Sequence, residues 1–175
     1  MVSTLLVLSI AAVSIALTWA LLRSRGTEVR GLEDWEARRN EIDFEMFRGL
    51  INPAEERYLQ ASLSKSQSRS FLRKRIGLAL RVMVLMGENA ALLTKLADLA
   101  RGAQSTTLVR EAEALSAAAL RLRMNLGLMK ICLWIKWCFP GWSVSVPAWE
   151  IGYNALLNHL VRVQDCAYGE ARIQG

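Results

Sequence analysis

Residues 72–100 repeat apolar side chains in alternating steps of four and three, which is the spacing of one face of an α-helix. The positions of this first seam are Leu72, Ile76, Ala79, Met83, Met86, Ala90, Leu93, Ala97 and Ala100. A second seam runs beside it through Leu78, Val82, Leu85, Asn89, Leu92, Leu96 and Leu99. The remaining face carries charge every seven residues, at Lys74, Arg81, Glu88 and Lys95. Two adjacent seams need cover on two sides, so the pattern predicts a bundle helix rather than a two-stranded coiled coil.

Residues 106–138 repeat the same steps of four and three and form the partner of this helix. Their seam runs through Leu108, Ala112, Leu115, Ala119, Leu122, Leu126, Met129 and Leu133. Residues 101–105 form the connection, in which Gly102 suits the end of one helix and Ser105 the start of the next. Such a short turn makes the two helices antiparallel, so residue j lies beside roughly residue 206 − j.

Two further helices complete a predicted four-helix domain over residues 32–167. The predicted helices are 32–50, 53–101, 106–138 and 147–166, and residues 168–175 are a frayed tail. Asn52-Pro53 separates the first two, and the polar residues 62–70 predict a kink or fraying in the second. No stretch alternates in the manner of a strand. The predicted fold class is therefore all-α, built on a long antiparallel helical hairpin.

The chain begins with 22 residues that carry no charge, followed by a basic linker over residues 23–31. At about 1.5 Å per residue such a run crosses the hydrocarbon of a bilayer as one helix. A cleaved signal peptide is the alternative, but no basic residue precedes the apolar run. All basic flanks follow it, which predicts a single-pass anchor in the inner (plasma) membrane with the N-terminus outside and the domain cytoplasmic. An organelle inner membrane has the equivalent topology.

Net charge is +6, and residues 65–81 hold basic side chains with no acid among them. Antiparallel pairing brings this run beside an aromatic and basic stretch, residues 126–149. We expect the two to form a patch for anionic head groups of the lipid bilayer, because Trp and Lys suit a bilayer interface. Its predicted members are Lys65, Arg69, Arg73, Lys74, Arg75, Lys130, Trp134, Lys136, Trp137 and Trp142. The alternatives are a solvated helix face or nucleic acid for the basic run, and core packing or a second membrane span for the aromatic stretch.

Groups that carry chemistry are scarce in this sequence. His159 is the single histidine and is expected at a polar edge, and the three cysteines form no metal or haem motif. No phosphate loop or nucleophile motif is present, which argues against an enzyme, a cofactor or a small-molecule substrate, and no DNA-binding motif accompanies the basic run. The sequence predicts a non-catalytic scaffold or accessory subunit with a membrane-protein partner. The alternative is a tethered regulator or adaptor that binds a helix or peptide.

Overall fold

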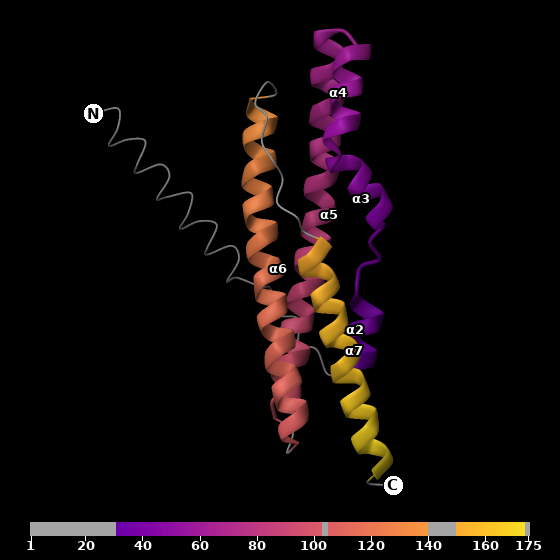
Figure 1. The fold of residues 1–175 in the computed structure, drawn as a ribbon, viewed down its shortest axis with the longest axis vertical. Helices are drawn as coiled ribbons and strands as arrows, with labels where there is room; N and C mark the ends of the chain where they lie inside the picture. Colours follow the sequence, from indigo (N-terminus) through magenta and orange to yellow (C-terminus); the bar gives the residue numbers. More distant parts are fainter. Residues whose placement is uncertain (1–30, 103–104, 140–149, 174–175) are drawn as a thin grey trace, which may run out of the picture.

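The structure is a computed structural model that describes residues 31–102, 105–139 and 150–173. Within these ranges the fold is entirely helical, as the sequence predicts (Figure 1). The helices are α2 (Leu32–Arg38), α3 (Phe44–Ile51), α4 (Pro53–Ser62), α5 (Lys65–Ala100), α6 (Thr106–Cys138) and α7 (Glu150–Ile173). The predicted anchor, residues 1–22, and linker residues 23–30 lie outside the described residues.

Helices α5 and α6 form the predicted antiparallel hairpin, and α7 packs against α6 (Figure 1). Every position of the α6 seam is buried, and so is the first seam of α5 up to Ala97. Helix α6 begins at Thr106, where the Ser105 side chain accepts from the N–H of Leu108, and ends at Cys138, as predicted. The core therefore runs along the full length of the hairpin.

The second seam of α5 is covered only in part. Asn89, Leu92 and Leu96 are buried, but Leu78 and Leu99 are about half exposed. The prediction that this seam is covered throughout is wrong at these two positions. Asn89 is the buried polar residue that the pattern singles out.

The predicted helix 32–50 is two helices, α2 and α3, separated by residues 39–43. The interruption has a polar cause. The Asn40 N–H donates to Oδ1 of Asn89 at 2.8 Å, and Nδ2 of Asn89 donates to the Asn40 carbonyl at 2.9 Å. Asn89 thus satisfies backbone groups that a continuous helix would have paired internally. After this segment, Asp43 caps α3 by accepting from the Met46 N–H.

The predicted helix 53–101 is also two helices, because the chain turns at Leu63 and Ser64. Leu63 is extended, and Ser64 starts α5 with a capping box whose other member is Gln67. A capping box satisfies N–H groups that would otherwise be unpaired at a new helix start. Helix α4 therefore runs back along the first turns of α5 (Figure 1). The chain thus reverses direction where the sequence predicts only a kink or fraying.

Helix α7 spans Glu150–Ile173, so the predicted end at residue 166 is wrong by two turns, and the tail predicted from residue 168 is helical as far as Ile173. Its predicted start near Pro147 lies outside the described residues. Among the described helices, α5 is long and apolar enough to cross a bilayer, and half of its apolar stretch is buried inside the bundle. A core helix meets the same criteria, so this property is weak support for a membrane span.

Candidate functional site

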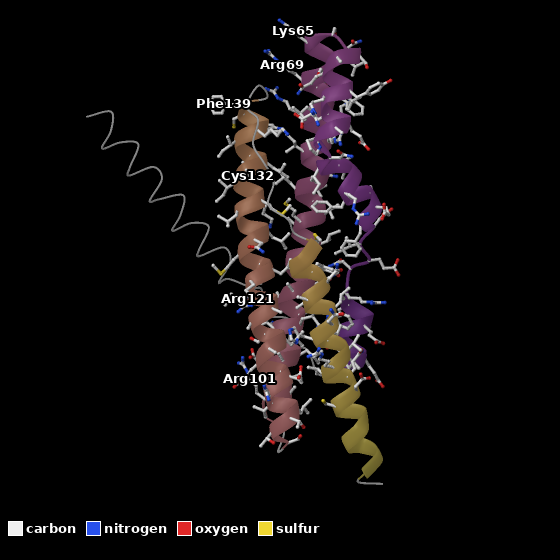
Figure 2. The ribbon with its side chains drawn as sticks, in the orientation of Figure 1. Lys65, Arg69, Arg101, Arg121, Cys132 and Phe139 are labelled. Atoms are coloured by element: carbon white, nitrogen blue, oxygen red, sulfur yellow. The ribbon has the colours of Figure 1, made fainter. Side chains whose placement is uncertain are left out.

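The basic run and the aromatic stretch meet at one end of the hairpin, as the antiparallel register predicts. The Arg73 guanidinium lies 5.5 Å from the ring centre of Trp137. Trp137 in turn packs edge-on against Trp134, with 5.5 Å between ring centres. Lys65 and Arg69 lie at the same end as Phe139, the residue that follows α6 (Figure 2). Residues about 60 positions apart in sequence therefore share one surface.

Four of the predicted basic residues are exposed at this end. They line a shallow depression with two serines, and its lining is Lys65, Ser66, Arg69, Ser70, Arg73 and Lys74. We call this surface the basic depression. Because no acidic residue lies between positions 65 and 81, its potential is positive. Lipid phosphate and other exposed anions are the ligands that such a surface attracts.

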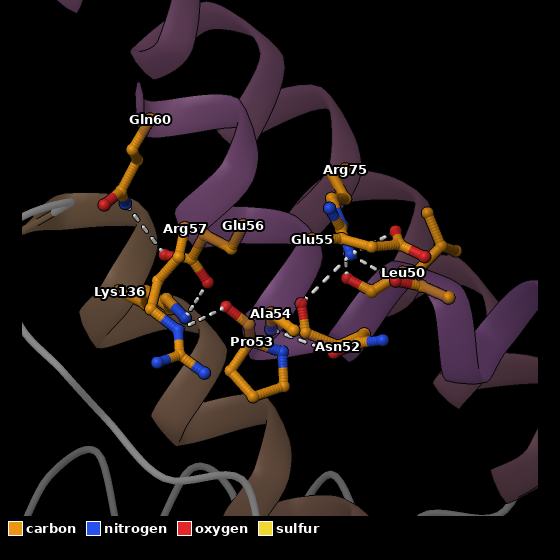
Figure 3. Close-up of polar contacts among 11 residues, drawn as sticks. Leu50, Asn52, Pro53, Ala54, Glu55, Glu56, Arg57, Gln60, Arg75 and Lys136 are labelled. Carbon is orange, nitrogen blue, oxygen red and sulfur yellow. Dashed lines mark hydrogen bonds and ion pairs between the residues drawn. The ribbon is translucent and has the colours of Figure 1, made fainter. Parts of the chain in front are cut away.

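Arg75 does not belong to this surface, and its predicted place in a membrane patch is wrong. Its side chain is only 6% exposed and turns inward toward the corner between α3 and α4 (Figure 3). Nε donates to the Leu50 carbonyl at 2.7 Å, and the guanidinium also donates to the carbonyls of Gly49 and Asn52. The Glu55 carboxylate lies 3.0 Å away. Arg75 therefore links α5 to the connection between α3 and α4.

Lys136 is also engaged within the protein. Its ammonium group forms an ion pair with Glu56 of α4, and both side chains are largely buried (Figure 3). Helix α4 itself has no buried residue. Arg75 from α5 and Lys136 from α6 thus hold α4 through two neighbouring carboxylates. A Lys136 paired in this way is not available to lipid head groups.

The remaining members of the predicted patch differ in exposure. Trp134 is 56% exposed and Trp137 is 39% exposed, which leaves both available at the surface. Lys130 is half-buried, and burial lowers the pKa of its ammonium group, although Glu88 acts in the opposite direction. A partly desolvated ammonium is a poor contact for a head group. Trp142 lies outside the described residues.

Sequence reasoning missed a second surface, the outer side of α6. Leu120, Met124, Leu128 and Ile131 are all exposed there, on the side opposite the buried seam. The signal was present in the sequence, because these residues recur in steps of four, four and three. The buried seam alone explains why this segment is a helix, so the second repeat was not recognised as a separate surface.

Groups for catalysis or metal binding are sparse in the described part of the chain. No cluster of three or more His, Cys, Asp or Glu side chains that could hold a metal occurs among those residues. His159 lies between helices rather than at an open polar edge, with Nδ1 3.7 Å from Oε2 of Glu111. Neither atom has a hydrogen-bond partner. A single imidazole beside one carboxylate supplies neither a nucleophile nor a metal ligand set.

Comparisons with protein-family models, with curated proteins and with solved structures find no match to this chain. Function must therefore be argued from the chain itself.

Proposed function

We propose that this protein is a non-catalytic, membrane-anchored helical scaffold or accessory subunit of a larger membrane complex. The observation that carries the proposal is the uncharged run of residues 1–22 and the basic flank after it. A bilayer-length apolar segment favours retention in the membrane. The Arg residues after the segment favour an N-out anchor in the inner (plasma) membrane or an organelle inner membrane, with the domain on the cytoplasmic or matrix side.

The helical domain supports a binding role rather than a chemical one. Its long hairpin is a rigid support, and it presents the cations of the basic depression and several exposed apolar side chains to partners. The basic depression suits anionic head groups, at on the order of 1 kcal/mol for each basic residue near a membrane surface. The domain would thus lie close to the bilayer that holds the anchor.

Membrane fractionation and reporter fusions test the anchor. The full chain should stay with membranes after alkaline carbonate washing. A reporter that is active only outside the cytoplasm should be inactive when fused after residue 50, and a cytoplasmic reporter should be active there. Release by carbonate, or a mature N-terminus near residue 20, would show that the segment is not a retained anchor.

Purification in a mild detergent tests the role of the domain. A subunit should co-purify with the same membrane proteins in fixed stoichiometry. Recovery of the protein alone under conditions that preserve known complexes of the same membrane would argue against a subunit role.

One observation favours the alternative, a tethered regulator or adaptor. The outer side of α6 is an exposed apolar helix face, and such faces pair with partner helices. Under this alternative, purification should recover one soluble partner whose binding is reversible, rather than a stable set of membrane proteins.

A further inference from the structure

The outer side of α6 is unusually free of charge for an exposed helix. Of the residues from Ala117 to Cys138 that are exposed, Arg121 alone is charged. We define the outer α6 face by its five large apolar members, which are Leu120, Met124, Leu128, Ile131 and Trp134, each between 37% and 58% exposed. Helix α5 exposes charged residues along a comparable length, at Arg73, Lys74, Arg81, Glu88 and Asp98.

The outer α6 face is broader than the seam of a coiled coil. At about 100° per residue its five members fall within an arc of about 120°, and from Leu120 to Trp134 the face is about 21 Å long. A two-stranded coiled coil uses a narrower seam with charged residues at its edges. On one flank the half-buried residues Asn125 and Cys132 are uncharged, whereas Arg123 and Lys130 are half-buried on the other flank. The breadth of the face favours a bilayer interface over a single partner helix.

The length of the linker decides how the domain can lie. Residues 23–30 reach at most about 30 Å when fully extended. Asn40, which follows α2, bonds to Asn89, and Asn89 lies about 36 Å along α5 from Lys65. Helix α2 lies still farther from that end of the bundle (Figure 1). An upright domain that stands on the basic depression would therefore place Gly31 beyond the reach of the linker.

A domain lying on its side has no such conflict. Helix α2 packs on α5, and α5 packs on α6. Two helix spacings of 8–10 Å put α2 about 20 Å above the axis of α6, within the reach of residues 23–30. In this position the outer α6 face meets the bilayer, and the basic depression lies at one end of the same helix pair, beside the head groups.

We infer that the outer α6 face lies in the interfacial layer of a phospholipid bilayer, with the hairpin axis along the membrane plane. The inference rests on the proposed anchor and names the partner of the domain. It changes the orientation expected from the sequence, in which only the end of the hairpin touches lipid. Apolar side chains would enter the boundary between head groups and acyl chains by about 5–10 Å.

Site-directed spin labelling of the full chain tests the orientation. The native cysteines are replaced by serine, single cysteines are introduced as Met124→Cys and Leu128→Cys, and the protein is reconstituted in vesicles of phosphatidylcholine and phosphatidylglycerol. The matched control is Val84→Cys, an apolar residue that is 46% exposed on the outer side of α5. Oxygen concentrates in lipid and a nickel chelate in water, so their collision rates with the label report its surroundings.

Labels at residues 124 and 128 should collide several-fold more with oxygen, relative to the nickel chelate, than the label at residue 84. Equal ratios at all three sites would place the outer α6 face in water and overturn the inference. Low collision rates with both probes at 124 and 128 would show protein cover, by a second copy or a partner helix, and would also overturn it. Circular dichroism confirms that each variant is folded.

The same vesicles separate this inference from the proposed function. If carbonate releases the protein, the anchor itself fails. If the protein resists carbonate but the labels at 124 and 128 report water, the anchor stands and the side-on orientation alone is rejected.

Discussion

The two long helices of the hairpin share one core but differ on their outer sides. Helix α5 is the described helix that is long and apolar enough to cross a membrane, yet its outer side is charged at intervals of seven residues. Residues 121–138 of α6 hold four basic residues, but Arg123, Lys130 and Lys136 are half-buried and Arg121 alone is exposed. The comparison teaches that the direction in which charges point, rather than their number, distinguishes a solvated helix from one suited to lipid.

The strongest test of the comparison contrasts the two sides of α6. Leu122 is fully buried, whereas Met124 is 58% exposed. Leu122→Ala should lower the free energy of unfolding by about 2–5 kcal/mol, because it removes buried methyl groups and leaves a cavity. Met124→Ala should change it by less than about 0.5 kcal/mol. Denaturant titration in detergent measures both, and similar losses would mean that the outer α6 face is covered by protein.

A second test contrasts two arginines on α5. Arg75→Met should cost about 1–3 kcal/mol, since the carbonyls of Gly49, Leu50 and Asn52 lose their donor. Arg73→Met removes only an exposed cation–π contact and should cost less than about 1 kcal/mol. Thermal unfolding by circular dichroism ranks the two variants. If they rank equally, Arg75 does not act as a buried clamp.

A third test addresses the one buried polar side chain on the inner side of α5 besides Arg75. Asn89→Ala should cost about 1–2 kcal/mol, because the N–H and carbonyl of Asn40 lose their partners. The substitution should then accelerate amide hydrogen exchange more in residues 39–43 than in α6. Asn154→Ala, at an exposed position on α7, serves as the control and should leave exchange in residues 39–43 unchanged. Uniformly faster exchange across the bundle would contradict a local role for Asn89.

The smallest expected effect concerns Lys130. Burial lowers the pKa of its ammonium group below the ordinary 10.5, so the unfolded chain binds the proton more tightly than the folded one. Stability should therefore rise with pH between the lowered pKa and 10.5. Lys130→Met should be slightly more stable than the wild type at pH 7 and should lack this rise. Melting temperatures at pH 7 and pH 10 measure the difference, and a less stable variant at pH 7 would show that the charge is well solvated.

Periodicity predicted the parts of the fold that depend on apolar burial. Residue spacing predicts the seams of α5 and α6, the turn between them and both ends of α6. The helical repeat decides which residues share a face, so the spacing can be read from the sequence. The same register predicts Arg73 at the level of Leu133, and its contact with Trp137 lies within about one helical turn of that level. Residue spacing predicts burial well where the same kind of apolar contact repeats along a helix.

Polar contacts between distant residues could not be predicted in this way. Arg75 stands among other basic residues, and nothing local distinguishes it, because its partners are carbonyls more than 20 positions earlier in the chain. The break before α3 depends in the same way on Asn89, which is 49 positions from Asn40. Side chains whose partners lie on another element are decided by tertiary structure rather than by spacing.

The attachment of α4 gives the protein a separable unit. Because α4 has no buried residue and is held by Glu55 and Glu56 against two cations, its opening exposes little apolar surface. Such units open with a free energy far below that of global unfolding. Added salt weakens exposed ion pairs, so the Glu55 contact should loosen first. The amide protons of α4 should therefore exchange together, and sooner than those of the hairpin, as a foldon that can detach while the core stays intact.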